Sequence, residues 1–113
     1  MNWQKPDKEV LKWHKSELGQ SLENLNQIKE LIQEKFLDIK SNEIDLVEAF
    51  LSKSKQWEDL IKKWLEKNSY DTGAYLWPLR VALSGQAKSP SPFEILSVLD
   101  KDEILNRINS VTK

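Results

Sequence analysis

The residues whose types and spacing could do chemistry are concentrated between Gly73 and Glu94. A single arginine, Arg80, interrupts an otherwise apolar run, Leu76-Trp77-Pro78-Leu79-Arg80-Val81-Ala82-Leu83. Shortly afterwards two prolines flank a serine and an aromatic residue follows at once, in Ser89-Pro90-Ser91-Pro92-Phe93. Prolines fix the backbone, and a guanidinium and an aromatic ring are flat groups on which a ligand can stack. The stretch therefore predicts a recognition surface that the rest of the chain supports.

No group of residues in the chain is typical of a catalyst. His14, the one histidine, has Ser16 nearby, but on a helix such a histidine is more often an exposed side chain without a catalytic role than a proton relay. The three glycines are scattered and match neither a phosphate-binding loop nor a dinucleotide fingerprint. Without cysteine and with one histidine, the chain offers no thiolate or histidine metal site. We expect the chain alone to be no enzyme and to bind neither metal nor cofactor.

The composition is that of one globular domain. Of its 113 residues 39% are hydrophobic and 31% charged, and no apolar run approaches the ~18 residues of a membrane span. The absence of cysteine fits a reducing compartment and predicts a cytoplasmic protein. Seventeen basic and eighteen acidic side chains give a net charge of -1, so no strong field attracts a polyanion. Any contact with nucleic acid must therefore be local.

Periodic apolar residues predict helices over the first two thirds of the chain. A short helix is expected over residues 7–15, and the longest periodic segment covers residues 16–36. Asn42 is the expected N-cap of the next helix, ahead of an acidic first turn and an apolar stripe that begins at Leu46. Trp57 and Trp64 then lie one above the other within a leucine and isoleucine stripe, which favours core packing over base stacking.

The last third contains two strong helix signals and one ambiguous one. Pro78 predicts either a kink or a helix that begins at Pro78, closing in both cases at Gly85. Ser91-Pro92-Phe93-Glu94 matches a helix start with an N-cap, a proline at the first position and a capping box, and Asp100 with Glu103 repeats the device. No strand pattern is present. We expect an all-α bundle of about six to seven helices, with residues 1–70 as a helical support subdomain and residues 71–113 as the recognition subdomain.

The recognition segment resembles the C-terminal anticodon-binding subdomain of bacterial glutamyl-tRNA synthetase. The family shows Pro-Leu-Arg, an Ala-Leu-Thr-Gly run, a Ser or Thr-Pro-Gly turn followed by Phe-Glu, and a Leu-Gly-Lys-Glu helix start. The matching residues here are Leu76-Trp77-Pro78-Leu79-Arg80-Val81-Ala82-Leu83-Ser84-Gly85, Ser89-Pro90-Ser91-Pro92-Phe93-Glu94-Ile95-Leu96, Leu99, Lys101 and Arg107-Ile108. This chain departs from the family by Ser84 for threonine, Ser91 for glycine, Pro92 for leucine and Asp100 for glycine.

The resemblance implies a module that holds the first two anticodon bases of tRNA for glutamate, with the third base read nearer the catalytic half of a glutamate–tRNA ligase. The signatures of that half, His-Ile-Gly-His-like and Lys-Met-Ser-Lys-Ser-like, are not in this sequence. ATP and Mg²⁺ would then belong to a catalytic domain in cis, and the partner is the tRNA anticodon loop, with no DNA and no membrane. The implied RNA-binding residues are Arg80, Ser89, Pro90, Ser91, Pro92 and Phe93, with Trp77 and Lys88 as further candidates.

The chemistry of an unstacked base suits these residues. Single-stranded loop bases are recognised by stacking on aromatic or guanidinium planes and by hydrogen bonds to their Watson-Crick edges. Phe93 and Arg80 would supply the planes. The carbonyls of Ser89, Pro90 and Ser91 would accept from the N–H of uracil or the amino group of cytosine. The alternative is a helical protein-protein adaptor that uses Trp77, Pro78 and Phe93 as a hydrophobic anchor.

Overall fold

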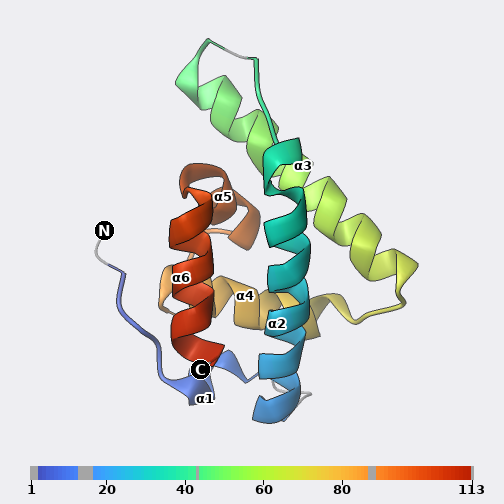
Figure 1. The fold of residues 1–113 in the computed structure, drawn as a ribbon, viewed down its shortest axis with the longest axis vertical. Coiled ribbons are helices and arrows are strands. Elements are labelled where there is room, and N and C mark those ends of the chain that lie inside the picture. Colours follow the sequence, from blue (N-terminus) through green and yellow to red (C-terminus); the bar gives the residue numbers. More distant parts are fainter. Residues whose placement is uncertain (1–2, 13–16, 43, 87–88, 113) are drawn as a thin grey trace.

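The protein is an all-α domain. The structure, a computed structural model, describes residues 3–12, 17–42, 44–86 and 89–112. Within these ranges it contains six α-helices, one 3-10 helix and no strand, which confirms the expected fold class (Figure 1). The elements are α1 (Lys8–Leu11), α2 (Leu18–Lys35), η1 (Phe36–Asp38), α3 (Leu46–Lys67), α4 (Thr72–Ser84), α5 (Pro92–Val98) and α6 (Lys101–Thr112).

The helices are arranged around α4. Helices α2 and α6 lie side by side, and α4 crosses both of them (Figure 1). Helix α1 packs against α4 and α2, while α5 packs between α4 and the long helix α3. One hydrophobic core joins all six α-helices, including Leu11, Ile28, Ile61, Leu79, Leu96 and Ile108. No helix in the described part of the chain is both long enough and apolar enough to span a membrane.

Helix α3 begins later than the sequence indicates. Its N-cap is Asp45, whose carboxylate Oδ1 accepts from the N–H groups of Val47 (2.8 Å) and Glu48 (3.2 Å). The expectation that Asn42 caps this helix is therefore wrong. Both residues have suitable side chains, but only Asp45 stands close enough to the first turn to reach its free N–H groups. The apolar side chains of Leu46 and Val47, the first two residues of the helix, are exposed.

Helix α4 runs unbroken through Pro78. It begins at Thr72, with Asp71 as N-cap accepting from Gly73 N–H (2.9 Å), so the alternative of a helix that begins at Pro78 is wrong. A proline inside a helix leaves the carbonyl four residues earlier without its N–H donor. Here that carbonyl belongs to Ala74, and it accepts from the side-chain Nδ2 of Asn24 on α2 (3.2 Å). A buried asparagine thus supplies the hydrogen bond that Pro78 cannot make.

Helices α5 and α6 start where the sequence predicts. Ser91 Oγ accepts from the N–H of Glu94 (3.3 Å), and Pro92 is the first residue of α5. Asp100 Oδ1 accepts from the N–H of Glu103 (2.8 Å) at the start of α6. The Glu103 carboxylate does not complete a capping box, because it accepts from Arg107 Nε one turn later (2.7 Å).

The tryptophans of α3 pack inward, as their spacing indicates. Trp57 is fully buried beside Phe36, with ring centroids 6.2 Å apart. Trp64 lies edge-on to Tyr70 and to Tyr75, at 5.3 Å and 5.6 Å. Such edge-to-face pairs add to the energy of simple burial. The aromatic residues therefore join the end of α3 to the start of α4 and contribute to the core, not to a stacking surface.

The aromatic contact between α3 and α4 predicts a stability loss at alkaline pH. Burial raises the pKa of Tyr75 to about 12, with Tyr70 adding to the effect. The unfolded chain then releases this proton near the ordinary tyrosine value of about 10, while the folded protein still holds it, so stability must fall above that pH. Tyr75→Phe should lose the hydrogen bond from Tyr75 Oη to Gln27 Oε1 (2.6 Å) and be less stable near neutrality.

The variant should also show a smaller decline than the wild type between about pH 10 and pH 12, which urea unfolding at a series of pH values will measure. Lysine deprotonation affects both proteins equally and cancels in the comparison. Parallel pH profiles would contradict the assignment of this decline to Tyr75.

Candidate nucleic-acid interface

A cavity lies where the start of α4 meets the start of α5. It has a volume of about 380 Å³, and Lys62 of α3 borders it. We call it the Arg80 pocket; its principal lining residues are Leu76, Trp77, Arg80, Ser91, Pro92 and Phe93. Five of the eight RNA-binding candidates are therefore brought together around one cavity, although they come from two helices separated by a loop.

Arg80 is the one arginine in this pocket, and it is half-buried. Within the described residues its guanidinium makes no hydrogen bond and no ion pair with another side chain or carbonyl. Lys62, at the edge of the pocket, differs because its ammonium donates to Glu58 Oε2 (2.9 Å), which lowers the pKa of the Glu58 carboxyl. A guanidinium has five N–H donors in a fixed plane, so Arg80 has donors to offer a ligand.

Trp77 is held in place from the N-terminal part of the chain. Its indole Nε1 donates to the carbonyl of Val10 on α1 (2.9 Å), and the ring is partly buried. A buried or half-buried indole N–H usually has such a partner, and the bond fixes which face of the ring the pocket presents. Helix α1 therefore acts as a positioning element for the Arg80 pocket.

Phe93 and Pro92 lie deeper than the sequence suggests. Phe93 lines the pocket but is only 6% exposed, so it does not present an open face for stacking as expected. The reason is that Phe93 is the second residue of α5, which packs against both α3 and α4. Phe93 stays a predicted RNA-binding residue only through the part of its ring that the pocket reaches.

Two of the three carbonyl groups expected to contact bases already accept a hydrogen bond within the chain. The Pro90 carbonyl accepts from Ser89 Oγ (3.0 Å), and the Ser91 carbonyl accepts from the N–H of Ile95 (3.3 Å). Each carbonyl oxygen has two lone pairs, so both can accept a second hydrogen bond. In the described part of the chain, the Ser89 carbonyl makes no hydrogen bond. Lys88 lies outside the described residues.

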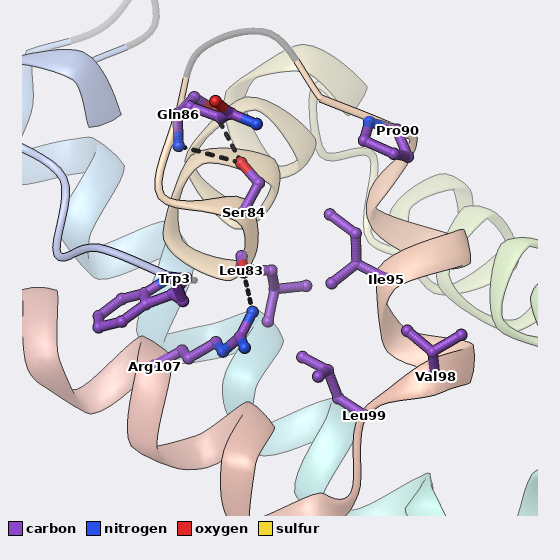
Figure 2. Close-up of a pocket in the computed structure, with 9 residues that line it drawn as sticks. All are labelled: Trp3, Leu83, Ser84, Gln86, Pro90, Ile95, Val98, Leu99 and Arg107. Atoms are coloured by element: carbon purple, nitrogen blue, oxygen red, sulfur yellow. Dashed lines mark hydrogen bonds between the residues drawn. The ribbon is translucent and has the colours of Figure 1, made fainter. Parts of the chain in front are cut away.

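The loop that carries these carbonyls leaves α4 through a tight exit. Gly85 ends the helix with φ of 79°, and its N–H donates to the carbonyl of Val81 (2.7 Å). Ser84 Oγ donates to the carbonyl of Gln86 (2.8 Å) and accepts from its N–H (3.1 Å) (Figure 2). A left-handed residue after the last helical turn is a common helix end, and glycine occupies it without strain.

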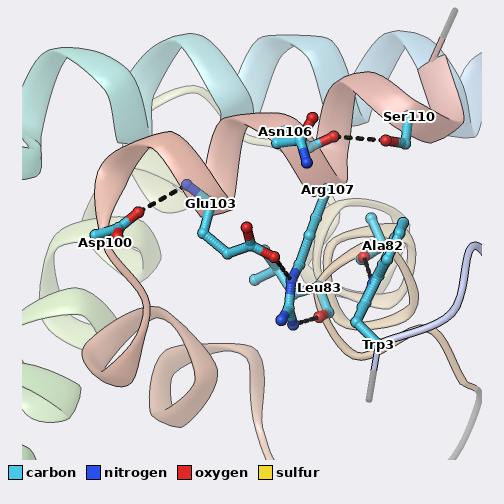
Figure 3. Close-up of polar contacts among 8 residues, drawn as sticks. All are labelled: Trp3, Ala82, Leu83, Asp100, Glu103, Asn106, Arg107 and Ser110. Carbon is cyan, nitrogen blue, oxygen red and sulfur yellow. Dashed lines mark hydrogen bonds and ion pairs between the residues drawn. The ribbon is translucent and has the colours of Figure 1, made fainter.

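Two side chains from distant parts of the sequence complete the end of α4. The Trp3 indole Nε1 donates to the carbonyl of Ala82 (2.9 Å), and Arg107 Nη1 donates to that of Leu83 (2.7 Å) (Figure 3). The last four carbonyls of a helix have no donor within the helix, so these bonds satisfy groups that would otherwise be unpaired. Neither Trp3 nor this use of Arg107 was predicted, because contacts across so many residues leave no local pattern.

Almost the whole chain matches one known protein family. Residues 3–112 match the sequence model of a family described as an anticodon binding domain. The chain belongs to the anticodon binding domain family. The match confirms the resemblance that the recognition segment carries, and it extends that resemblance to α1, α2 and α3.

Relatives of this anticodon binding domain are longer proteins. The chain is 34% identical to a glutamate–tRNA ligase of Methylacidiphilum infernorum over 95% of its own length and 24% of that protein. It is 35% identical to glutamate–tRNA ligase 2 of Campylobacter concisus, over 79% of the chain and 18% of the ligase. The chain therefore spans about a quarter or less of the curated relatives it matches. No solved structure matches it.

Proposed function

We propose that this anticodon binding domain reads the first two anticodon bases of tRNA for glutamate as part of a glutamate–tRNA ligase. The observation that carries the proposal is Arg80, a guanidinium with no partner among the described residues, in a cavity bordered by Trp77 and the Ser91 helix start. The N–H donors of this guanidinium are therefore available to a ligand in the pocket. The names of the relatives support glutamate as the amino acid.

The pocket suits one base swung out of an RNA loop. The base would lie against the Trp77 ring and the Arg80 guanidinium, both of which provide flat surfaces. Guanidinium N–H groups would donate to a base carbonyl or a phosphate, and the carbonyl of Ser91, which lines the pocket, would accept from the N–H or amino group of a pyrimidine. Pro90 and Pro92 keep the backbone fixed, so little conformational entropy is lost when RNA binds.

In this proposal the chemical steps belong to another part of the enzyme. ATP and Mg²⁺ would bind to a catalytic domain in cis, where amino-acid activation takes place in the cytoplasm. The anticodon binding domain would contribute selection of the tRNA and its orientation. The described residues contain no cluster of three or more His, Cys, Asp or Glu side chains that could hold a metal ion.

The test is the binding of RNA to an Arg80→Ala variant. Fluorescence titration with the anticodon stem-loop of tRNA for glutamate should show tighter binding than with a swapped loop, in which the first two anticodon bases are replaced by other bases. Arg80→Ala should weaken binding of the cognate loop about tenfold and reduce this preference, because one good guanidinium contact to a base is worth about 1–3 kcal/mol.

A matched control removes one positive charge elsewhere. Lys63 is exposed on α3 and does not line the Arg80 pocket, so Lys63→Ala should change the affinity less than about twofold. Thermal unfolding will establish that both variants are folded. Equal weakening by the two substitutions, or equal binding of cognate and swapped loops by the wild type, would show that the domain does not read bases through Arg80.

A further inference from the structure

A second cavity borders the same loop on the side of α5 and α6. It has a volume of about 260 Å³ (Figure 2). We call it the Trp3 pocket; the lining residues used below are Trp3, Pro90, Ile95, Val98, Leu99 and Arg107. Pro90 lines this pocket, and the next residue, Ser91, lines the Arg80 pocket. The two cavities are thus adjacent along the chain at one proline.

The walls of the Trp3 pocket are apolar and open to solvent at one edge. Ile95, Val98 and Leu99 come from one turn of α5 and the residue after it, and they face the end of α4 (Figure 2). Val98 lines the pocket and is 67% exposed, which places it at the rim. For comparison, a cavity of about 150 Å³ lined by apolar side chains holds a benzene molecule. The Trp3 pocket therefore has room for one planar base.

The inner end of the pocket carries a flat cation held in a fixed orientation. The Arg107 guanidinium lies over the Trp3 ring, 5.6 Å from its centroid. Its Nε donates to Glu103 Oε1 and its Nη1 to the Leu83 carbonyl, both at 2.7 Å. Three contacts fix the plane of the guanidinium, and Glu103 compensates its charge. Because the Glu103 carboxylate already pairs with the guanidinium, the site favours a flat, polarisable ligand over an anionic one.

We propose that the Trp3 pocket holds a second nucleobase, the neighbour in the RNA loop of the base in the Arg80 pocket. This inference rests on the proposed function and assigns Val98 and Ile95 to the RNA interface. The ribose-phosphate backbone would cross the chain at Ser89 and Pro90, so that consecutive bases are splayed to the two sides of the proline. Recognition of single-stranded RNA depends on such splayed bases, each stacked against apolar or flat groups.

The chemistry of the neighbourhood favours RNA over a peptide side chain. A hydrophobic anchor from a protein partner would fill the apolar pocket but would make no use of the neighbouring Arg80 guanidinium and Ser89 carbonyl. An RNA strand carries the phosphate and base oxygens and the base N–H groups that can pair with both. The family to which the chain belongs binds anticodons, and the two cavities share one loop. A single RNA strand accounts for both cavities at once.

The test compares two valines of equal exposure. Val98 is 67% exposed at the rim of the Trp3 pocket, and Val47 is 66% exposed at the start of α3, away from both pockets. Val98→Ser should weaken binding of the anticodon stem-loop of tRNA for glutamate about fivefold, since a stacked base loses part of its apolar contact. Val47→Ser should leave the affinity unchanged. Fluorescence anisotropy with the full chain gives both values, and thermal unfolding checks that both variants fold.

Stem-loops with one abasic nucleotide identify the base that enters the pocket. At one loop position, removal of the base should weaken wild-type binding and should leave Val98→Ser with no further loss. At an adjacent loop position, removal of the base should weaken wild-type binding but should not weaken binding by Arg80→Ala any further. Unchanged binding of Val98→Ser, or a Val98→Ser defect that persists at every abasic position, would overturn the second site while leaving the Arg80 pocket intact. Loss of all anticodon preference in the wild type would reject the proposed function itself.

Discussion

Replacing Gly85 with alanine should lower the free energy of unfolding by about 3 kcal/mol. Two effects add. The residue has φ of 79°, where a Cβ atom is strained. A Cβ at this position would also lie 2.3 Å from the backbone oxygen of Gln4 and 3.2 Å from its nitrogen. Backbone atoms cannot rotate away, so the segment that contains Trp3 must shift and its hydrogen bond to the Ala82 carbonyl weakens. Urea unfolding of the two proteins will measure the difference.

Gly19 provides the matched control for this substitution. It lies in the first turn of α2, and a Cβ atom added there would meet nothing within 4 Å. Gly19→Ala should therefore leave stability unchanged or raise it by about 0.5 kcal/mol, because alanine restricts the unfolded chain more and favours helix. If Gly85→Ala cost no more than Gly19→Ala, the close approach of the N-terminal segment to the end of α4 would be wrong.

The N-terminal segment supports both pockets although its own residues give little sign of it. Trp3 caps the end of α4 and lines one pocket, while the Val10 carbonyl orients Trp77 in the other. From the sequence, Trp3 is only an aromatic residue near the start. Its partner is 79 residues away, and no periodicity or turn signal connects the two. Long-range positioning contacts of this kind depend on how the helices pack, so sequence patterns cannot reveal them.

Local signals were reliable where one residue type satisfies one local requirement. Ser91 and Pro92 set the start of α5, and Asp100 sets that of α6, because each cap bonds an N–H within three residues. They failed where two residues competed for one role, as Asn42 and Asp45 did at the start of α3. Burial was the other failure: an aromatic after a rigid turn can face inward or outward, and the packing of α5 decides that Phe93 faces inward.

Removing the side-chain amide of Asn24 should cost about 2 kcal/mol of stability. Asn24 is 2% exposed, and its Nδ2 group donates to the Ala74 carbonyl, the group left without a helical donor by Pro78. Gln20 Nε2 in turn donates to Asn24 Oδ1 (2.8 Å), which fixes the orientation of the amide. Asn24→Ala would leave a buried carbonyl without its partner. Asn26, exposed on the same helix, is the control, and Asn26→Ala should change stability by less than about 0.5 kcal/mol.

A double-mutant cycle with Pro78 separates this explanation from a simple loss of packing. In a Pro78→Ala background, residue 78 has an N–H that can donate to the Ala74 carbonyl within the helix. Asn24→Ala should then cost at least about 1 kcal/mol less than it does beside the proline, which urea unfolding of the four proteins will show. If Asn24 only filled space between α2 and α4, its removal would cost the same in both backgrounds. A coupling energy near zero would therefore mean that the amide does not compensate for the proline.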